Sequence, residues 1–213
     1  CGFYNNTDSG TITSTGTLYN EGAPLKLLSS TFANNTTQKH AGAIFLGLDA
    51  TTEIINCTFF NNKTPGNGGA IFGGRQKIRI LNCTFSENEG SYGPAIFNDV
   101  PDAVTIMNTI FVNNNPIINQ YAYRNCTVTY TTGSNVFQWP KEKSNGKPDN
   151  TCISDAVFID PQLDSLKSNG GFTLTMAIGK NSPVVGICDS CPETDQRGLP
   201  RKKRCDAGAY ESR

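Results

Sequence analysis

A short motif recurs along the first half of the chain at nearly constant spacing. Each copy has a phenylalanine followed three residues later by an asparagine, and the phenylalanines are 27, 26 and 26 residues apart. A second motif, Ala-Ile-Phe, lies between these copies at steps of 27 and 25 residues. Two motifs that alternate with one period predict a solenoid. The repeated residues are Phe32, Phe59, Phe85 and Phe111 of the first motif, and Ile44, Ile71 and Ile96 of the second.

Alternation of apolar and small residues inside each copy indicates strands. Leu28, Ser30 and Phe32 occupy alternate positions, and the later copies repeat this pattern, which is typical of a strand with one buried face. We therefore expect these positions to face the interior. The residues between them are expected to point to solvent, and in the later copies these are Asn56, Asn82 and Asn108.

The length of the repeat identifies the kind of solenoid. At about 3.3 Å per residue, 26 residues are too long for one strand, so each repeat must bend several times. Segments rich in Asn, Gly and Pro supply the turns. We predict an all-β, right-handed, single-stranded parallel β-helix with coils of about 26 residues and internal ladders of the repeated Phe and Ile side chains. A leucine-rich repeat has a similar period, but its spaced leucines are missing and Ala-Ile-Phe has no counterpart there.

The whole chain, residues 1–213, is expected to form one domain. Residues 16–115 hold the regular coils, and residues 116–213 are expected to form less regular coils and a disulfide-closed cap at the C-terminal end.

The repeats resemble those of polymorphic outer-membrane-type surface proteins, in which Gly-Gly-Ala-Ile alternates with Phe-x-x-Asn. Gly68–Ile71 and Phe59–Asn62 carry these two motifs most clearly. The tail resembles the closing segment of choice-of-anchor Q surface proteins. The resemblance implies an exported right-handed β-helix without an enzymatic site, although this chain ends at Arg213 with no visible anchor segment. The matching tail segments are Asp160–Leu163, Asn169–Thr173, Asn181–Val184, Asp195–Arg201 and Cys205–Glu211.

Eight cysteines in a weakly charged chain favour an oxidising, extracellular or cell-surface location. A zinc site is disfavoured because Cys188 and Cys191 form a lone CxxC and His40 is the only histidine. We expect no metal, no cofactor and no catalytic residues, and we place His40 on a surface turn.

Three cysteine pairs are candidates for disulfides. Cys191 and Cys205 bracket a loop and are favoured, and Cys126 with Cys152 is a second choice. Cys57 and Cys83 occupy equivalent positions one coil apart, within the Cα range of a disulfide. We slightly favour two small buried thiols instead, because stacked Cβ vectors are parallel. These six residues leave Cys1 and Cys188 without an assigned partner.

Seven Asn-x-Ser/Thr sequons could carry glycans if the chain passes through a eukaryotic secretory route, and none would be modified in a bacterium. The candidate acceptors are Asn5, Asn34, Asn35, Asn56, Asn62, Asn82 and Asn125.

Charge excludes some partners. Lys+Arg and Asp+Glu are equal at 18 each, so nucleic acid is not expected, and no apolar run is long enough for membrane insertion. The charged residues that a polysaccharide lyase or epimerase would need are scattered singly. The basic run Arg201–Arg204 resembles a convertase site, but we favour a solvated loop inside a disulfide. The scattered charges are Asp49, Glu53, Lys63, Arg75, Lys77, Arg79, Glu87 and Asp99.

These features predict a surface structural or adhesive scaffold rather than an enzyme. Self-assembly into fibres is one expectation, because residues 1–18 leave an uncapped first coil whose Thr11–Thr15 stretch favours strand pairing. A carbohydrate-binding module and a polysaccharide lyase or epimerase are the alternatives. The aromatic residues available for stacking on a carbohydrate, which spacing does not gather on one face, are Tyr19, Tyr92, Tyr121, Tyr123 and Trp139.

Overall fold

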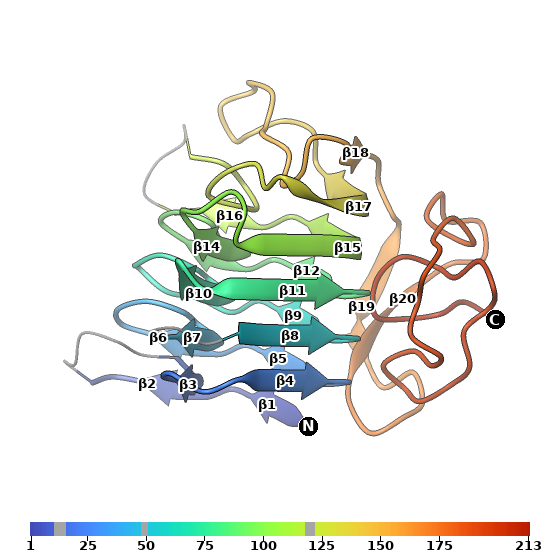
Figure 1. The fold of residues 1–213 in the computed structure, drawn as a ribbon, viewed down its shortest axis with the longest axis horizontal. Helices are drawn as coiled ribbons and strands as arrows, with labels where there is room; N and C mark the ends of the chain where they lie inside the picture. The colour runs from blue at the N-terminus through green and yellow to red at the C-terminus, as the bar shows by residue number, and fades with distance from the viewer. Residues whose placement is uncertain (11–15, 48–50, 118–121) are drawn as a thin grey trace.

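The computed structural model describes residues 1–10, 16–47, 51–117 and 122–213. These residues form a parallel β-helix of about five turns with roughly 26 residues per turn (Figure 1). The fold class predicted from the repeats is therefore confirmed. Within the described ranges there is no helix long and apolar enough to cross a membrane. Thr11–Thr15, Asp49 and Tyr121, on which some expectations rest, lie outside these ranges.

Three parallel faces enclose the interior, and neighbouring coils pair strand by strand on each of them. The first face consists of β3 (Leu18–Asn20), β7 (Ile44–Leu46), β10 (Ile71–Gly74) and β14 (Ile96–Asn98). The second consists of β4 (Leu25–Leu28), β8 (Thr51–Ile55), β11 (Lys77–Leu81) and the first half of β15 (Val104–Val112). The third consists of β1 (Gly2–Tyr4), β5 (Thr31–Ala33), β9 (Thr58–Phe60), β12 (Thr84–Ser86) and the second half of β15.

The remaining strands complete the coils or lie outside them. A narrow ladder contains β2 (Thr7–Asp8), β6 (Thr36–Thr37), β13 (Glu89–Gly90) and β16 (Asn115–Pro116). The last coil contains β17 (Thr132–Trp139), which pairs with β15, and β18 (Val157–Phe158). An antiparallel hairpin of β19 (Leu163–Lys167) and β20 (Thr175–Ile178) runs across the ends of the second-face strands (Figure 1).

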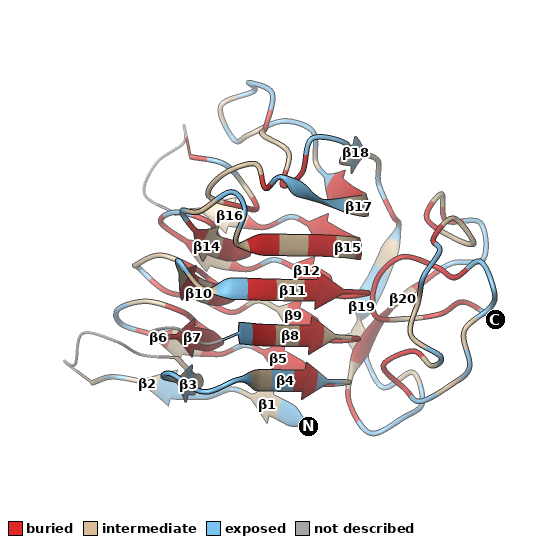
Figure 2. Ribbon diagram, viewed as in Figure 1, coloured by how far each residue is buried: buried red, intermediate tan, exposed pale blue. Residues whose placement is uncertain are grey.

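Equivalent residues of the repeats lie directly above one another. Phe32 pairs with Phe59, and Phe85 pairs with both Phe59 and Phe111. The stack begins one coil earlier than the sequence indicated, at Phe3, and consecutive ring centroids are 4.4 to 5.2 Å apart. The central strands are mostly buried, whereas β1 at the N-terminal end is exposed or intermediate (Figure 2). The predicted ladder residues, all fully buried, are Phe32, Phe59, Phe85, Phe111, Ile44, Ile71 and Ile96.

The predicted alternation is wrong at its first position. Leu28 is 50% exposed and Leu27 faces the interior instead. Between β4 and β5, Ser29 adopts a left-handed conformation with φ of 47°, which turns the corner and breaks the period of two. Asparagine tolerates this conformation better than most residues. It therefore occupies the equivalent corners at Asn56, Asn82, Asn108 and Asn135, where φ is 49 to 53°.

The expectation that Asn56, Asn82 and Asn108 point to solvent is also wrong. Their exposed fractions are 4%, 0% and 0%, because residues 160–213 cover this corner from outside. We call residues 160–213 the C-terminal segment. The amide of Asn56 donates to the Thr194 carbonyl at 2.7 Å, and that of Asn108 donates to the Asp189 carbonyl at 2.9 Å. The corner asparagines thus bind the coils to the C-terminal segment.

The C-terminal segment does not cap the end of the stack as predicted but runs along its flank. The Leu174 carbonyl accepts a hydrogen bond from Thr31 of the second coil at 2.6 Å. Farther up the stack, the Gly208 amide donates to the Asn108 carbonyl at 2.9 Å. The segment therefore contacts several coils in succession and is held outside the third face, which explains why Thr31, Thr58 and Thr84 are buried.

A different part of the chain covers the end of the last coil. Cys152 and Ile153 enter the interior there, next to Tyr130, and join the main hydrophobic core. Ile153 pairs with Tyr130, and the disulfide of Cys126 and Cys152 fixes the loop to the preceding coil. Residues 140–156 lie beyond β17 in Figure 1 and so form the closing element at this end.

Candidate functional site

The outer surface of the first face carries a second row of stacked aromatic rings. Tyr19, Phe45, Phe72 and Phe97 lie on successive strands of this face and pair in register. The consecutive ring centroids are 5.3, 4.8 and 4.9 Å apart. Each phenylalanine follows the buried isoleucine of an Ala-Ile-Phe motif, so strand geometry directs it outward. The third residue of the motif therefore carries a signal for an outer aromatic row, whereas the predicted ladder rests on the isoleucine alone.

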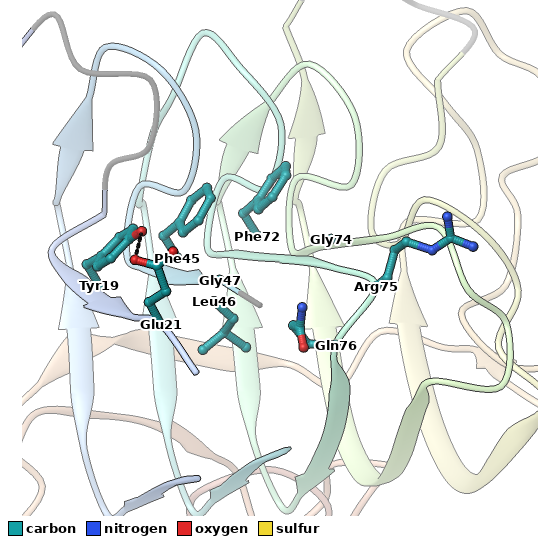
Figure 3. Close-up of a pocket in the computed structure, with 9 residues that line it drawn as sticks. All are labelled: Tyr19, Glu21, Phe45, Leu46, Gly47, Phe72, Gly74, Arg75 and Gln76. Atoms are coloured by element: carbon teal, nitrogen blue, oxygen red, sulfur yellow. Dashed lines mark hydrogen bonds between the residues drawn. The ribbon is translucent and has the colours of Figure 1, made fainter. Parts of the chain in front are cut away.

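A groove of about 330 Å³ opens beside this row, at the corner where the coils leave the first face (Figure 3). We call it the aromatic groove. Tyr19 and Glu21 lie at one end, and Arg75 lies at the other (Figure 3). The rings of Phe45 and Phe72 form one wall, opposite Leu46 and Gln76. The groove therefore combines an apolar wall with polar groups at its margins.

Its polar groups offer both donors and acceptors of hydrogen bonds. The Tyr19 hydroxyl donates to Glu21 Oε2 at 2.8 Å, and this bond to a carboxylate is the main cause that raises the pKa of Tyr19. The Glu21 carboxylate is thereby oriented at the mouth of the groove. The guanidinium of Arg75 and the side-chain amide of Gln76 form no hydrogen bond or ion pair with another described residue. Both are available to a ligand.

His40 borders this face rather than standing on an open surface turn as predicted. Its ring packs against Phe72 with centroids 5.1 Å apart, and Nδ1 accepts a hydrogen bond from the Asn67 amide at 3.0 Å. Burial, and secondarily the charge of Lys39, lower the pKa of His40. Neutral His40 is therefore part of the packing around the aromatic row.

Of the aromatic residues proposed for carbohydrate stacking, Tyr121 lies outside the described ranges, and among the other four only Tyr19 belongs to the groove. Tyr92 is 47% exposed on a loop. Tyr123 packs with Lys143, whose Nζ lies 4.7 Å from the ring centroid, and Trp139 ends strand β17. The structure does not bring these three together with Tyr19.

Three of the charged residues considered for catalysis, Glu53, Lys63 and Arg79, form ion pairs. Glu53 forms ion pairs with Lys26 at 3.1 Å and with Arg79 at 3.8 Å on the second face. Lys63 pairs with Glu89 at 3.2 Å. Lys77 and Arg79 line a shallow hollow on the second face. Arg75 belongs to the aromatic groove, and Glu87 and Asp99 line neither the hollow nor the groove. The described residues contain no cluster of three His, Cys, Asp or Glu suited to a metal ion.

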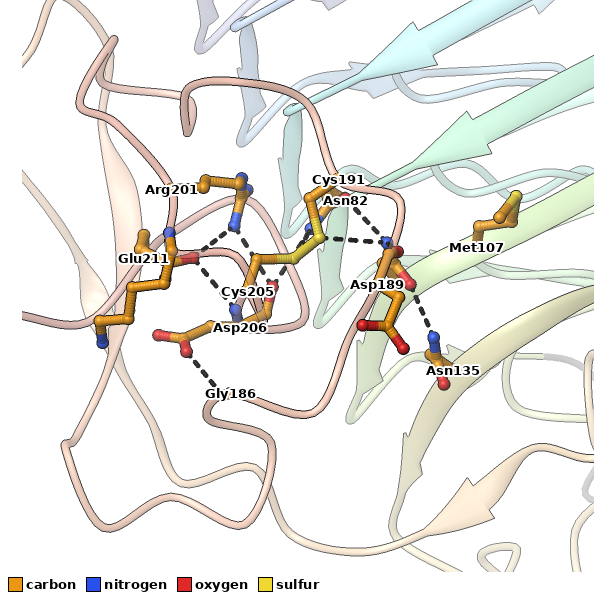
Figure 4. The surroundings of a disulfide bond; sticks show 12 residues. Asn82, Met107, Asn135, Gly186, Asp189, Cys191, Arg201, Cys205, Asp206 and Glu211 are labelled. Carbon is orange, nitrogen blue, oxygen red and sulfur yellow. Dashed lines mark hydrogen bonds and ion pairs between the residues drawn. A yellow bond between two sulfur atoms is a disulfide. The ribbon is translucent and has the colours of Figure 1, made fainter.

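Two disulfides are present: one joins the favoured pair, Cys191 and Cys205, and the other joins Cys126 and Cys152, for which the sequence supports no more than a guess. Cys126 and Cys152 have Cα atoms 5.4 Å apart, and those of Cys191 and Cys205 are 6.5 Å apart (Figure 4). Both separations lie within the range that disulfides require.

Cys57 and Cys83 are buried free thiols rather than a disulfide. Each thiol lies 3.3 Å from the carbonyl oxygen two residues earlier, and Cys83 Sγ accepts a hydrogen bond from the Cys57 amide at 3.4 Å. The thiols therefore occupy the small inward position that Ser30 and Thr109 fill in other coils. Burial raises the pKa of Cys83, and it raises that of Cys188 to about 12.

Burial removes most of the glycosylation candidates from solvent in the folded protein. Asn5 and Asn34 are exposed, and they remain predicted acceptors. A glycan requires an open side-chain amide, so the other five sequons are unsuited to carry one. Asn56 and Asn82 lie under the C-terminal segment, and the acceptors inside the coils are Asn35, Asn62 and Asn125.

The sequence predicts that the basic run, Arg201–Arg204, is a solvated loop. The structure shows instead that its first residue is buried. Arg201 forms an ion pair with Glu211 at 3.1 Å, and both side chains are 1% exposed (Figure 4). The nearby Asp195 and Arg197 form a second buried pair at 2.6 Å. Only Lys202, Lys203 and Arg204 of the run face solvent. The first arginine is therefore a structural residue.

The stacked faces define the class of this protein as a parallel β-solenoid. Comparison of the chain with protein-family models, with curated proteins and with solved structures found no match.

Proposed function

We propose that the protein is a structural or adhesive scaffold at a cell surface. The observation that supports this most directly is the C-terminal segment bound along the flank, which contacts the coils from Thr31 to Asn108. Opening one coil would also break its contacts with this segment, so local unfolding is opposed. A scaffold exposed to proteases and mechanical load requires this kind of rigidity. The resemblance of the repeats to those of bacterial surface proteins supports the same function.

The cysteine chemistry supports an extracellular location. The two disulfides indicate a non-cytoplasmic environment, because thiols are kept reduced in the cytosol. Labelling of intact source cells with an antibody against the folded protein tests the proposal. We expect signal on intact cells, where an antibody to a cytosolic protein gives none. Signal confined to permeabilised cells would contradict a surface role.

Self-association through the first coil is a second proposal. Within the described part of the chain, β1, β3 and β4 each pair on one side only, with β5, β7 and β8. Residues 140–156 cover the opposite end, so contact between unlike ends, as in a fibre, is disfavoured and two first coils would meet instead. Light scattering over a hundredfold dilution should show a dimer that dissociates. A monomer of 23.0 kDa at every concentration would exclude this association.

We propose no catalytic role for the charged second face. A lyase needs a base that is free to remove a proton, whereas Glu53 is held between Lys26 and Arg79. We expect no product from pectate or alginate, with or without calcium. Turnover that disappears in the Arg79→Ala variant would instead establish the lyase alternative.

A further inference from the structure

We propose that the aromatic groove binds an uncharged polysaccharide chain. This inference rests on the adhesive scaffold proposed above and gives that scaffold a ligand class. The groove lies on the outer surface of the first face, and its wall consists of the stacked rings that begin at Tyr19 (Figure 3). The C-terminal segment binds at the corner between the second and third faces, and no residue of that segment lines the groove.

The groove combines apolar and polar groups, and a sugar ring has both kinds of group as well. A pyranose presents apolar C–H groups that pack on aromatic surface, and it presents hydroxyl groups that both donate and accept hydrogen bonds. Phe45 and Phe72 supply the aromatic surface. The Glu21 carboxylate can accept, while the Gln76 amide can do both and the Arg75 guanidinium can donate. Ligand sites commonly combine an apolar lining with a few such polar groups.

The charges at the groove favour an uncharged ligand. Among the residues that the structure describes, one carboxylate, Glu21, and one guanidinium, Arg75, line the groove, and their charges cancel. A polyuronate chain would place a negative charge on every sugar and would require several cationic side chains along its path. The described lining of the groove has one such side chain, Arg75.

The repetition of the rings favours a chain rather than a single terminal sugar. The groove extends over three coils, from Tyr19 through Phe45 to Phe72, with ring centroids 5.3 and 4.8 Å apart. This spacing is similar to the length that one pyranose unit adds to an extended polysaccharide. A ligand with a repeated unit can therefore make the same contact on successive coils.

Affinity electrophoresis in native gels tests this inference. The gels would contain galactomannan, hydroxyethylcellulose or laminarin as uncharged polysaccharides, or polygalacturonate as the anionic probe. We expect at least one uncharged polysaccharide to retard the wild-type protein. Tyr19→Ala and Gln76→Ala should each weaken this binding by about fivefold or more, since each removes one contact at the groove. Gln76→Ala leaves the aromatic stack in place, so it remains informative if Tyr19→Ala disturbs folding.

A matched control is available on another loop. Tyr92 is 47% exposed and Tyr19 is 48% exposed, so Tyr92→Ala removes an equally accessible ring away from the groove. This variant should bind like the wild type. No retardation by any uncharged polysaccharide, equal losses in Tyr19→Ala and Tyr92→Ala, or binding to polygalacturonate alone would each overturn the inference. Surface labelling tests the scaffold separately from the ligand. If the protein is found on the cell surface but binds no uncharged polysaccharide, only the proposed ligand is contradicted. If the protein is found inside the cell, the proposed function itself is contradicted.

Discussion

Asn88 Oδ1 accepts two hydrogen bonds from Asn62, one coil earlier, from the backbone amide at 3.1 Å and from the side-chain amide at 2.9 Å. Asn88 in turn donates to Asn114 Oδ1 at 2.9 Å and to the Phe59 carbonyl at 3.1 Å. Both Asn62 and Asn88 are fully buried. A polar ladder therefore runs through the interior beside the phenylalanine stack, and it satisfies groups that burial would otherwise leave unpaired.

Replacing Asn88 by Ala should interrupt this ladder. The backbone amide and the side-chain amide of Asn62 would each lose their bond to Asn88 Oδ1 inside the protein. Because each unsatisfied buried group costs about 1–3 kcal/mol, we expect the free energy of unfolding to fall by about 2–5 kcal/mol in equilibrium urea unfolding. The control is Asn67→Ala, at a half-buried asparagine whose side chain is outside the ladder. Equal losses in the two variants would argue against a stabilising ladder.

The phenylalanine stack leads to a second prediction. Phe85→Ala removes a fully buried ring between Phe59 and Phe111 and should lower the unfolding free energy by about 3–5 kcal/mol. Phe172→Ala makes the same chemical change at a fully exposed ring and should cost no more than about 0.5 kcal/mol. Chemical unfolding of both variants measures the difference. A loss below about 1 kcal/mol for Phe85→Ala would place this ring on the surface.

The stacked coils could be predicted from the repeats because each coil fills its interior with the same kinds of residue at the same positions. The Phe and Ile ladders follow from period and alternation alone. The corner at Asn56 could not be found in this way, because one left-handed residue reverses the alternation without changing the composition. Alternation alone therefore predicts Leu28 inside and Asn56 outside, whereas Leu28 is 50% exposed and Asn56 is buried.

The candidate site was only partly predictable. Its aromatic row was visible in the third residue of each Ala-Ile-Phe motif, but Tyr19 comes from a weaker first copy. The polar margin comes from non-repeating turns at Glu21 and Arg75, for which a repeat pattern carries no information. The contacts of the C-terminal segment, such as Asn56 with Thr194, join residues 138 apart and have no local signal.

His40 provides a prediction about pH. Protonation at Nδ1 would break its hydrogen bond from the Asn67 amide, and burial and Lys39 also disfavour the charged form. Because the pKa is lowered in the folded state, the unfolded chain binds more protons near and below about pH 6.5, and stability falls with decreasing pH in that window. His40→Gln cannot titrate and should show a smaller loss between about pH 7.5 and about pH 5.5. Identical pH profiles in urea unfolding would exclude this role.

Thiol counting tests the arrangement of the cysteines. Cys1 is exposed, whereas Cys57, Cys83 and Cys188 are buried free thiols. An aromatic disulfide reagent should therefore react quickly with one thiol in the native protein and with four after denaturation without reductant. The Cys1→Ser variant should lose the fast-reacting thiol alone. Two thiols in the denatured protein, with Cys1 still reacting in the native protein, would instead show a third disulfide among Cys57, Cys83 and Cys188.

The buried ion pair of Arg201 and Glu211 leads to the last prediction. Both side chains are 1% exposed, and burial is the main cause that lowers the pKa of Arg201. Removing one partner leaves the other charge uncompensated, so Arg201→Ala should lower the unfolding free energy by about 3–5 kcal/mol. Arg204→Ala makes the same substitution at an exposed position of the same basic run and should change it by at most about 0.5 kcal/mol.

A double variant separates loss of the charge pair from loss of packing. Glu211 also accepts hydrogen bonds from the backbone amides of Asp206 at 3.0 Å and Lys202 at 3.3 Å. Adding Glu211→Gln to Arg201→Ala removes the stranded charge while the amide oxygen can keep one such bond. Equilibrium urea unfolding should therefore show the double variant to be more stable than Arg201→Ala alone. If the two losses simply add, the pair does not interact, and Arg201 stabilises the C-terminal segment through its contacts with Asn56 and Gly208 instead.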